Sequence, residues 1–339
     1  MHADREALVV QAQEMEKTVV ITGAASGIGK ATAIEFARSG WNIVAVARSG
    51  KGLEELVPEC ELLGGTVLTQ VADVTDQVSM NTVAANAVES FGRIDVWVNN
   101  AGVILYGKFG EEPHELYRQV METNFFGCVH GSRAALPYFR EQKQGVLINV
   151  ASFAGKLAMP FSSAYSASKA AIGVFSQALR MELLAEPDIH VCTVFPASID
   201  TPLYRHAANY SGRGVRPISP VYLPDRVAKR IVRLAGRPKG EVLVGSAGRA
   251  GSLMHVLMPA LSERVMAHMV FRRGFQDRAA PITDGNLFQS DDELTGIDGG
   301  WTSSRERSAL RQAMIGIGAL GPGIGALGWL LGRLYLKRV

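Results

Sequence analysis

Tyr165 and Lys169 stand four residues apart, thirteen residues after Ser152. A helix would place the phenol and the ammonium on one face, about 5 to 6 Å apart at their Cβ atoms. An unperturbed tyrosine has a pKa near 10, so only about one in a thousand is ionised at pH 7. A neighbouring ammonium stabilises the phenolate and lowers this pKa. With Ser152 donating a hydrogen bond to a substrate carbonyl oxygen, the three side chains predict acid and base chemistry coupled to hydride transfer.

A glycine-rich turn upstream indicates where a cofactor for this chemistry would bind. Residues 18–22 form a β-branched run, Gly23, Gly27 and Gly29 follow it, and a helix is expected over residues 30–39. Glycines let the backbone approach a pyrophosphate, and the N-terminus of the helix presents free N–H groups to it. The order of strand, turn and helix therefore predicts a dinucleotide site.

The pattern of the chain alternates between strand and helix, which is typical of a parallel sheet covered on both faces. Strands are expected near residues 18–22, 42–47, 66–71, 94–98, 145–150, 189–195 and 241–244. We therefore predict an α/β fold, a single Rossmann-type doubly wound parallel sheet with a C-terminal helical extension. Ligands bind such sheets at the carboxyl ends of the strands, and Gly23, Asn100 and Ser152 all follow expected strand ends.

Several motifs in this order closely resemble the short-chain dehydrogenase/reductase family. The family's Thr-Gly-x-x-x-Gly-x-Gly turn matches residues 22–29, and its Asn-Asn-Ala-Gly motif matches residues 99–102. Its serine and its Tyr-x-x-x-Lys pair match the three residues described first. The resemblance covers about residues 18–245. One departure is Pro196-Ala197, where the family has Pro-Gly.

The resemblance also implies roles for residues that spacing alone does not single out. It adds Asn124 as a fourth catalytic residue, which holds a water in the proton relay, so the expected catalytic set is Asn124, Ser152, Tyr165 and Lys169. The expected cofactor-binding residues are Gly23, Ser26, Gly27, Ile28, Gly29, Arg48, Asp73, Val74, Asn100, Ala101, Gly102, Tyr165, Lys169, Pro196, Ile199 and Thr201. It further implies a homo-oligomer paired through the helices that carry Asn124 and Tyr165.

The end of the second expected strand bears on the choice of cofactor. An acid about twenty residues after the glycine turn would hold the 2′-hydroxyl of NAD, whereas an arginine without an acid suits a 2′-phosphate. Ala47 and Arg48 stand here, as in members of the family that prefer NADP. We therefore expect NADP, with NAD the less favoured cofactor. The alternative is that Arg48 is a solvated loop charge.

Composition excludes several other classes of protein. Of 339 residues, 47% are apolar, enough for a sizeable core. The three cysteines, Cys60, Cys128 and Cys192, are widely spaced, so we expect reduced thiols and no metal. The seven histidines show no ligand spacing, and each is expected to be a surface or core residue. A nucleoside triphosphatase is a poor alternative, because Ala31 stands where a magnesium-binding hydroxyl belongs.

We predict four segments along the chain. They are a leader at residues 1–17, which is not a signal peptide, a dinucleotide-binding catalytic domain at 18–250, a helical and irregular extension at 251–304, and an apolar, glycine-rich tail at 305–339. Within the extension, residues 252–270 are methionine-rich and helical in period, which indicates a core face or the lining of an apolar channel. Residues 274–304 are expected to be irregular.

The tail differs chemically from the rest of the chain. Residues 312–332 carry no charge over 21 positions and are flanked by basic residues. From Trp301 onward there are six basic residues and one acid, so the basic balance belongs to the tail and argues against a nucleic-acid enzyme. Pro322 and seven glycines leave three alternatives open: a membrane span, an interfacial hairpin and a flexible tail. We expect a cytoplasmic protein, with membrane association through the C-terminus as an open alternative.

The function predicted from these observations is an NADP-dependent oxidoreductase that interconverts a secondary alcohol and a ketone. An apolar small-molecule substrate is expected, because Phe153, Met159, Phe161 and Phe195 lie beside the motifs and the loop at residues 199–222 offers Leu203, Tyr204 and Tyr210. The alternative from another class is a catalytically idle, membrane-associated protein that binds NADP as a sensor or scaffold. The intact catalytic set disfavours it.

Overall fold

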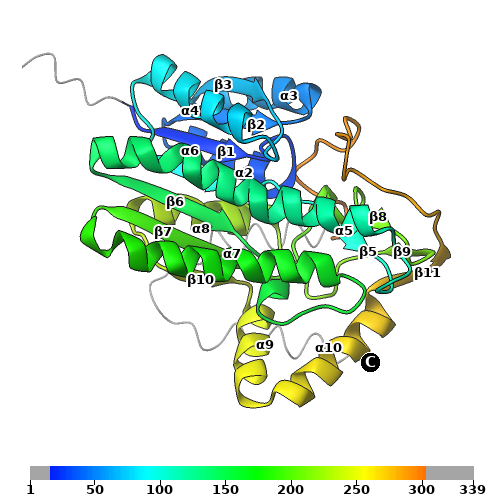
Figure 1. The fold of residues 1–339 in the computed structure, drawn as a ribbon. Coiled ribbons are helices and arrows are strands. Elements are labelled where there is room, and N and C mark those ends of the chain that lie inside the picture. Colours follow the sequence, from blue (N-terminus) through cyan, green and yellow to red (C-terminus); the bar gives the residue numbers. More distant parts are fainter. Residues whose placement is uncertain (1–15, 303–339) are drawn as a thin grey trace, which may run out of the picture. The chain divides into compact units, whose positions relative to one another are not determined.

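A seven-stranded parallel sheet forms the centre of the protein in the computed structural model, which describes residues 16–302 (Figure 1). The strand order is β10-β7-β6-β4-β1-β2-β3, so the order reverses between the paired strands β1 and β4. The strands are β1 Thr18–Thr22, β2 Asn42–Ala47, β3 Thr66–Val71, β4 Val96–Asn99, β6 Gly145–Val150, β7 Ile189–Pro196 and β10 Glu241–Val244. This is the predicted doubly wound α/β fold.

Helices cover both faces of the sheet, and each face has its own apolar cluster. One face packs against α2 Gly27–Ala37, α3 Gly50–Glu61 and α8 Pro224–Gly236. The other packs against α4 Gln77–Phe91, α6 Gly127–Gln142 and α7 Ser163–Glu182 (Figure 1). Every residue of β1, β2, β4 and β6 is buried. A strand that is covered on both faces reads as a continuous apolar run, which is why the sequence predicts most strand bounds to the residue.

Two strands and one helix differ from their expected bounds: β7 ends one residue later, at Pro196, and β4 and α2 differ at both ends. Strand β4 begins at Val96 rather than residue 94, because Ile94 and Asp95 still belong to the loop in which Arg93 pairs with Asp95 at 2.6 Å. Helix α2 begins at Gly27 rather than Lys30, so Gly27 and Gly29 of the glycine turn lie in the first turn of the helix. Backbone N–H groups of this first turn are therefore the ones that lie nearest the sheet edge.

A π-helical segment, η1 Glu122–Phe126, joins α5 His114–Met121 to α6. Single π turns inside helices are rare and often occur at functional sites. Asn124 lies in this segment and is 1% exposed, so the irregular turn aims a polar side chain into the protein.

The extension forms two helices and a strand, which corrects the expectation of one helical stretch over 252–270 and an irregular segment from 274. The helices are α9 Ser246–Leu257 and α10 Pro259–Arg273, and β11 Phe275–Ala279 pairs antiparallel with β9 Arg213–Val215. The break falls at Met258 because a proline follows it, and proline lacks an N–H and disfavours the helical conformation of the preceding residue. Met266 is buried, whereas Met258 is 49% exposed, so the methionines do not share one core face.

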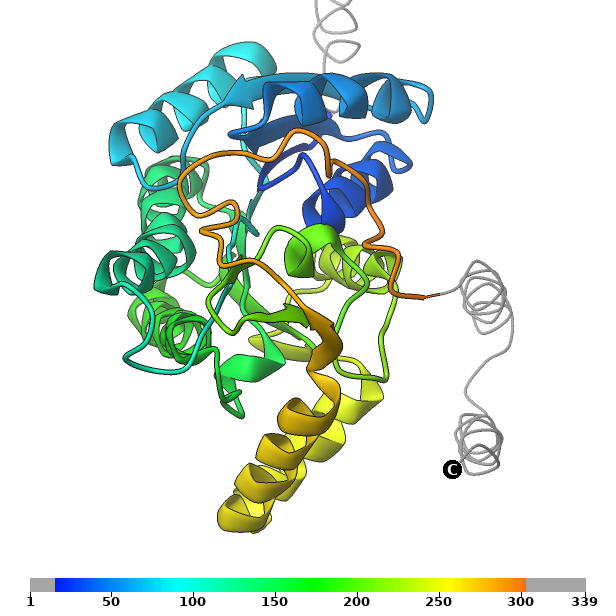
Figure 2. The same ribbon diagram turned by 90° about the vertical axis from the view of Figure 1, so that its right-hand side faces the viewer.

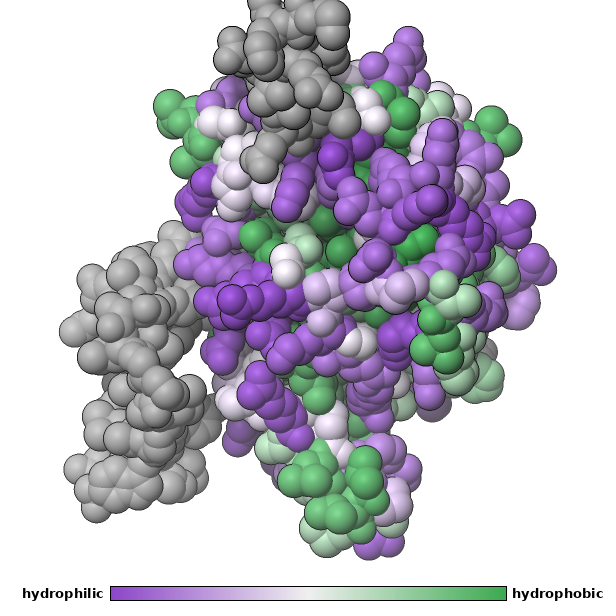
Figure 3. All heavy atoms as spheres, turned by 90° about the vertical axis from the view of Figure 1, so that its left-hand side faces the viewer, coloured by the Kyte–Doolittle hydropathy of each residue, from purple (hydrophilic) through white to green (hydrophobic). Residues whose placement is uncertain are grey.

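The two helices form a hairpin that projects from the sheet domain (Figure 2). Apolar side chains gather at its end (Figure 3), and the exposed ones are Leu253, Val256, Leu257, Met258 and Leu261. A two-stranded pair of β5 Leu105–Tyr106 and β8 Ala208–Asn209 lies near the carboxyl edge of the main sheet.

Residues 284–301 follow β11 in the chain and cross the carboxyl edge of the sheet without regular structure (Figure 2). We call this segment the strap. It belongs to the compact unit that ends at Trp301. Most of the predicted leader and all of the predicted tail lie outside the described residues. Within residues 16–302, no helix is both long and apolar enough to cross a membrane, and no cluster of metal-ligating side chains is found. The three cysteines are buried free thiols.

Candidate active site

The glycine turn lies at the carboxyl end of β1 and is held there by the Asn-Asn-Ala-Gly motif. The Asn100 side-chain amide donates to the carbonyl oxygens of Thr22 at 2.9 Å and Gly23 at 3.2 Å. Gly23 and Gly27 have φ of 67° and 54°, in the left-handed region that favours glycine. A Cβ at Gly29 would lie 2.0 Å from the Gly23 carbonyl oxygen, so only glycine fits beneath the turn.

Buried amide side chains tie the strands of this edge to the helix that carries Tyr165. Asn99 on β4 donates to Asn149 on β6 at 2.9 Å, and Asn149 donates to Ser176 on α7 at 2.9 Å. Satisfied buried networks of this kind fix one arrangement of their elements. The position of α7 relative to the sheet edge is therefore set by polar contacts as well as by apolar packing.

Ser152, Tyr165 and Lys169 meet at this edge. Ser152 follows β6 and accepts a hydrogen bond from the Ala154 N–H at 3.1 Å, while Tyr165 and Lys169 lie one turn apart near the start of α7. Burial raises the pKa of Tyr165 above its usual value of 10, and a hydrogen bond from Ser152 works in the opposite direction. The serine thus stabilises the ionised form of the tyrosine that would exchange a proton.

Burial, rather than the Lys169 charge that the sequence suggested, has the largest effect on the pKa of Tyr165. The Lys169 ammonium donates to the Val150 carbonyl oxygen at 2.9 Å and lies 5.8 Å from the centre of the Tyr165 ring. Burial lowers the pKa of Lys169 itself from 10.5 to about 8. The helical spacing brings the two side chains together, but the spacing does not reveal that both are buried, and burial dominates both pKa values.

Asn124 lies behind the catalytic side chains rather than in the pocket wall. Its amide exchanges hydrogen bonds with the backbone of Val103, at 2.8 and 2.9 Å, and donates to Ser168 at 3.0 Å. A Cβ at Gly102 would lie 3.3 Å from both the Asn124 Oδ1 atom and the Lys169 Nζ atom. The Asn124 and Lys169 side chains therefore both flank Gly102.

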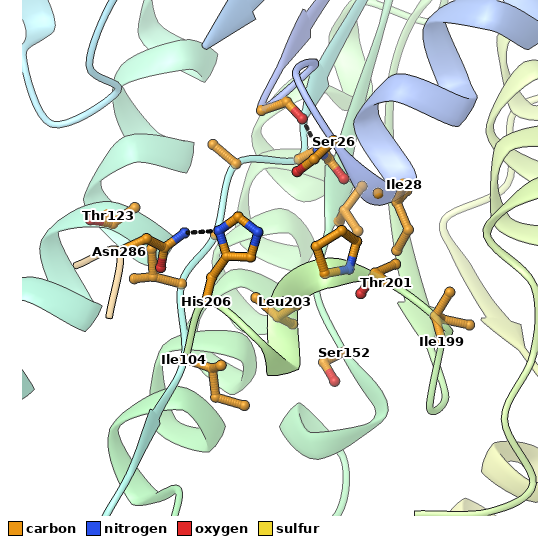
Figure 4. Close-up of a pocket in the computed structure, with 18 of the residues that line it drawn as sticks. Ser26, Ile28, Ile104, Thr123, Ser152, Ile199, Thr201, Leu203, His206 and Asn286 are labelled. Atoms are coloured by element: carbon orange, nitrogen blue, oxygen red, sulfur yellow. Dashed lines mark hydrogen bonds between the residues drawn. The ribbon is translucent and has the colours of Figure 1, made fainter. Parts of the chain in front are cut away.

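A pocket runs along the carboxyl edge from the glycine turn to the catalytic side chains (Figure 4). Of the predicted site residues, Gly29 and Asn124 do not line it. The predicted residues that do are Gly23, Ser26, Gly27, Ile28, Arg48, Asp73, Val74, Asn100, Ala101, Gly102, Ser152, Tyr165, Lys169, Pro196, Ile199 and Thr201. At the catalytic end the wall includes the apolar or aromatic side chains of Ile104, Phe153, Met159, Leu203 and Tyr204.

Arg48 is neither free nor a solvated loop charge. Its guanidinium donates to the strap carbonyl oxygens of Leu287 at 3.1 Å and Gln289 at 3.4 Å, and also to that of Asn286. Asp73 lies farther away, at 3.7 Å. The side chain is 22% exposed and lines the pocket.

His206 and the strap line the pocket although the sequence did not point to them. The strap residues in the wall are Asn286, Ser290, Asp291, Leu294 and Thr295. His206 Nε2 lies 3.1 Å from the Leu294 carbonyl oxygen, which can only accept, so Nε2 carries a proton. Burial lowers the pKa of His206, opposed by Asp291. Neither His206 nor the strap belongs to a recognisable motif or has a ligand spacing. The sequence therefore held no signal for this part of the pocket wall.

Asn286 carries an unsatisfied atom into this pocket. Its amide nitrogen lies 3.4 Å from the His206 Nδ1 atom (Figure 4), while its Oδ1 atom is buried and has no hydrogen-bond partner among the described residues. A buried acceptor without a donor is costly, and a ligand donor would satisfy it. Together with the glycine turn and Arg48, the wall suits a dinucleotide with its phosphates at the turn and its reactive end near Tyr165.

Comparisons with known proteins identify the family of the chain. The family described as short chain dehydrogenase matches residues 17–210. The uncharacterized oxidoreductase YxnA of Bacillus subtilis is 33% identical over 296 residues, which cover 86% of this chain and 83% of the relative. The chain belongs to the short-chain dehydrogenase/reductase family, and it is an oxidoreductase that acts on CH–OH donors.

Two solved structures resemble the fold and differ in what they bind. A short chain dehydrogenase from Mycobacterium paratuberculosis, bound to NAD, has a TM-score of 0.61 and 27% identity and covers 68% of this chain and 97% of its own. An alcohol dehydrogenase from Thermococcus sibiricus, complexed with 5-hydroxy-NADP, has a TM-score of 0.59 and 26% identity and covers 68% of this chain and 96% of its own. A nicotinamide cofactor is common to both.

Proposed function

We propose that the protein is an NADP-dependent oxidoreductase that interconverts a secondary alcohol and a ketone on an apolar small molecule. The observation that carries this proposal is the single pocket that joins Arg48 and the glycine turn to Ser152, Tyr165 and Lys169. A nicotinamide bound there supplies or accepts the hydride. All other steps fall to side chains of this chain.

The roles of the catalytic residues follow from their contacts. Ser152 orients the substrate oxygen and stabilises the Tyr165 phenolate through the hydrogen bond between them. Tyr165 gives its proton to the substrate oxygen during reduction and takes it back during oxidation. Lys169 is placed by its hydrogen bond to the Val150 carbonyl oxygen. A charged lysine there favours each step in which negative charge grows on the phenol.

Arg48 supports NADP over NAD. One related structure is bound to NAD and the other is complexed with 5-hydroxy-NADP. Resemblance therefore does not decide between the two cofactors. The end of β2 has Arg48 and no acid at the position that would hold a ribose 2′-hydroxyl, and an arginine suits a phosphate through bidentate, charge-assisted hydrogen bonds.

An apolar substrate is supported by the catalytic end of the pocket. Phe153, Met159 and Leu203 line it beside Ser152 and Tyr165, and an apolar cluster that includes Tyr165 and Ala154 extends behind them. Ligand sites are mostly apolar walls with a few polar groups that fix orientation.

Cofactor titration tests the choice of dinucleotide. We expect Arg48→Asp to weaken NADPH binding by roughly ten- to a hundred-fold and NADH binding much less, because a charge-assisted bond is replaced by repulsion. Lys51→Asp, an exposed charge reversal three residues away that does not line the pocket, is the control. An unchanged NADPH to NADH ratio in the Arg48 variant would contradict the proposal.

Oligomerisation and membrane contact are further parts of the proposal. Exposed apolar side chains on η1 and α7, namely Phe126, Val174 and Met181, support pairing through these helices. The apolar tail at 305–339 lies outside the described residues, and its uncharged run with basic flanks supports attachment to an anionic membrane surface.

A further inference from the structure

The strap closes over the nucleotide end of the pocket and is fastened along its length. Leu287 is fully buried in the apolar cluster that contains Tyr165. The Thr295 hydroxyl donates to Glu55 on α3 at 2.6 Å, and the Trp301 indole donates to the Thr201 carbonyl oxygen at 3.2 Å. The strap thus touches elements from both halves of the sheet.

The glycine turn takes part in this fastening while it still faces the pocket. The Gly27 N–H donates to the Gly296 carbonyl oxygen at 3.0 Å. Ser26, Gly27 and Ile28 nevertheless line the pocket beneath the strap. The strap therefore covers the site where phosphates would lie and does not fill it.

The contact between the strap and Arg48 bears directly on how the pocket would bind an anion. Three neutral carbonyl oxygens of the strap accept from this guanidinium. Carbonyl oxygens fix the planar group without cancelling its charge, and the Asp73 carboxylate lies 3.7 Å from its Nη1 atom. A guanidinium has five donors, of which the strap uses three, so donors remain for an anion. Orienting a flexible charged side chain before a ligand binds removes part of the entropy loss of binding.

We propose that the strap is a working part of the dinucleotide site, which holds Arg48 ready for a 2′-phosphate and thereby sets the preference for NADP. Asn286 adds the unpartnered Oδ1 atom as an acceptor for a donor group of the dinucleotide. The proposal rests on the NADP dependence proposed above.

Two strap variants test this without touching Arg48. Leu287→Ala removes the buried anchor, and Thr295→Val removes the hydrogen bond to Glu55 while it keeps the side-chain shape, so that it tests the strap even if the first variant folds poorly. Leu183→Ala, a buried leucine in the apolar cluster on the sheet face that α4, α6 and α7 cover, is the control. Equilibrium titration with NADPH and NADH and stopped-flow displacement give affinities and dissociation rates.

We expect the strap variants to bind NADPH about tenfold more weakly, mainly because NADPH dissociates faster. The affinity for NADH should fall distinctly less. Tighter binding in the variants would show that the strap competes with the dinucleotide, and an equal loss for both cofactors would show that it does not act through Arg48. Either result overturns the proposal, as do unchanged affinities. Failure of the proposed function looks different: the wild-type chain would then bind neither dinucleotide or would prefer NADH.

Discussion

At the scale of single residues, burial shifts the pKa values of both titratable groups of the site. Tyr165 resists ionisation and Lys169 resists protonation, because both lose their water. A neutral phenol next to an easily deprotonated ammonium is a resting state from which a proton can move in either direction. The direction then depends on whether the substrate oxygen is gaining or losing negative charge.

Removing the phenol tests this directly. Tyr165→Phe keeps the ring and deletes the proton, so we expect turnover to fall by about a hundred-fold or more while cofactor binding changes little. Tyr138→Phe, on α6 and away from the pocket, is the control. Steady-state rates with NADPH and a ketone, together with cofactor titration, separate the two effects. Turnover near that of the wild type would remove Tyr165 from its assigned role.

Lys169→Met should give a more stable but inactive protein. In the unfolded chain the ammonium has its usual pKa of 10.5, whereas in the folded protein the pKa is about 8. The folded state therefore bears a penalty for the charge that is complete below about pH 8 and absent above about pH 10.5. We expect the free energy of unfolding to rise by up to about 3 kcal/mol at pH 7, less the bond to Val150.

Chemical denaturation at a series of pH values measures that penalty. The difference between Lys169→Met and the wild type should shrink as the pH rises from 8 towards 10.5, because the wild-type lysine then folds uncharged. A difference that stays constant with pH, or a variant less stable at pH 7 than the wild type, would show that burial is not the dominant effect at this lysine.

At the scale of elements, the sequence predicted the strands and the residues that follow them. Fully buried parallel strands read as apolar runs, and residues such as Asn100 and Ser152 stand directly behind them. The helical spacing of Tyr165 and Lys169 placed both on one face of α7. Local patterns of this kind involve few residues that are distant in sequence, which is why they can be read without the structure.

The strap, His206 and the break at Met258 were not predictable in the same way. The strap has no period, and its bonds to Arg48 join residues about 240 positions apart. His206 lines the pocket because Leu294 and Asn286 of the strap contact it. The helix break had a local signal in Pro259, which the methionine pattern concealed. Contacts between distant segments leave no trace in local spacing, whereas a proline does.

At the scale of the whole molecule, the sheet, the pocket and the strap all lie within residues 18–301. We therefore expect a chain ending at Ser304 to bind NADPH as tightly as the full-length chain, while only the full-length chain sediments with vesicles of anionic lipid. Vesicles of neutral lipid serve as the control for surface charge. Loss of NADPH binding on truncation would show that the folded dinucleotide site needs the tail. Failure of the full-length chain to sediment would show that the tail does not bind the membrane.

The contact between Arg48 and Leu287 also has a consequence for synthesis on the ribosome. The two residues are 239 positions apart, so at roughly 5 to 20 residues per second the second is made on the order of 10 to 50 s after the first. During that interval the growing polypeptide has a glycine turn but no cover above it. The strap is thus the last part of the pocket wall to be synthesised.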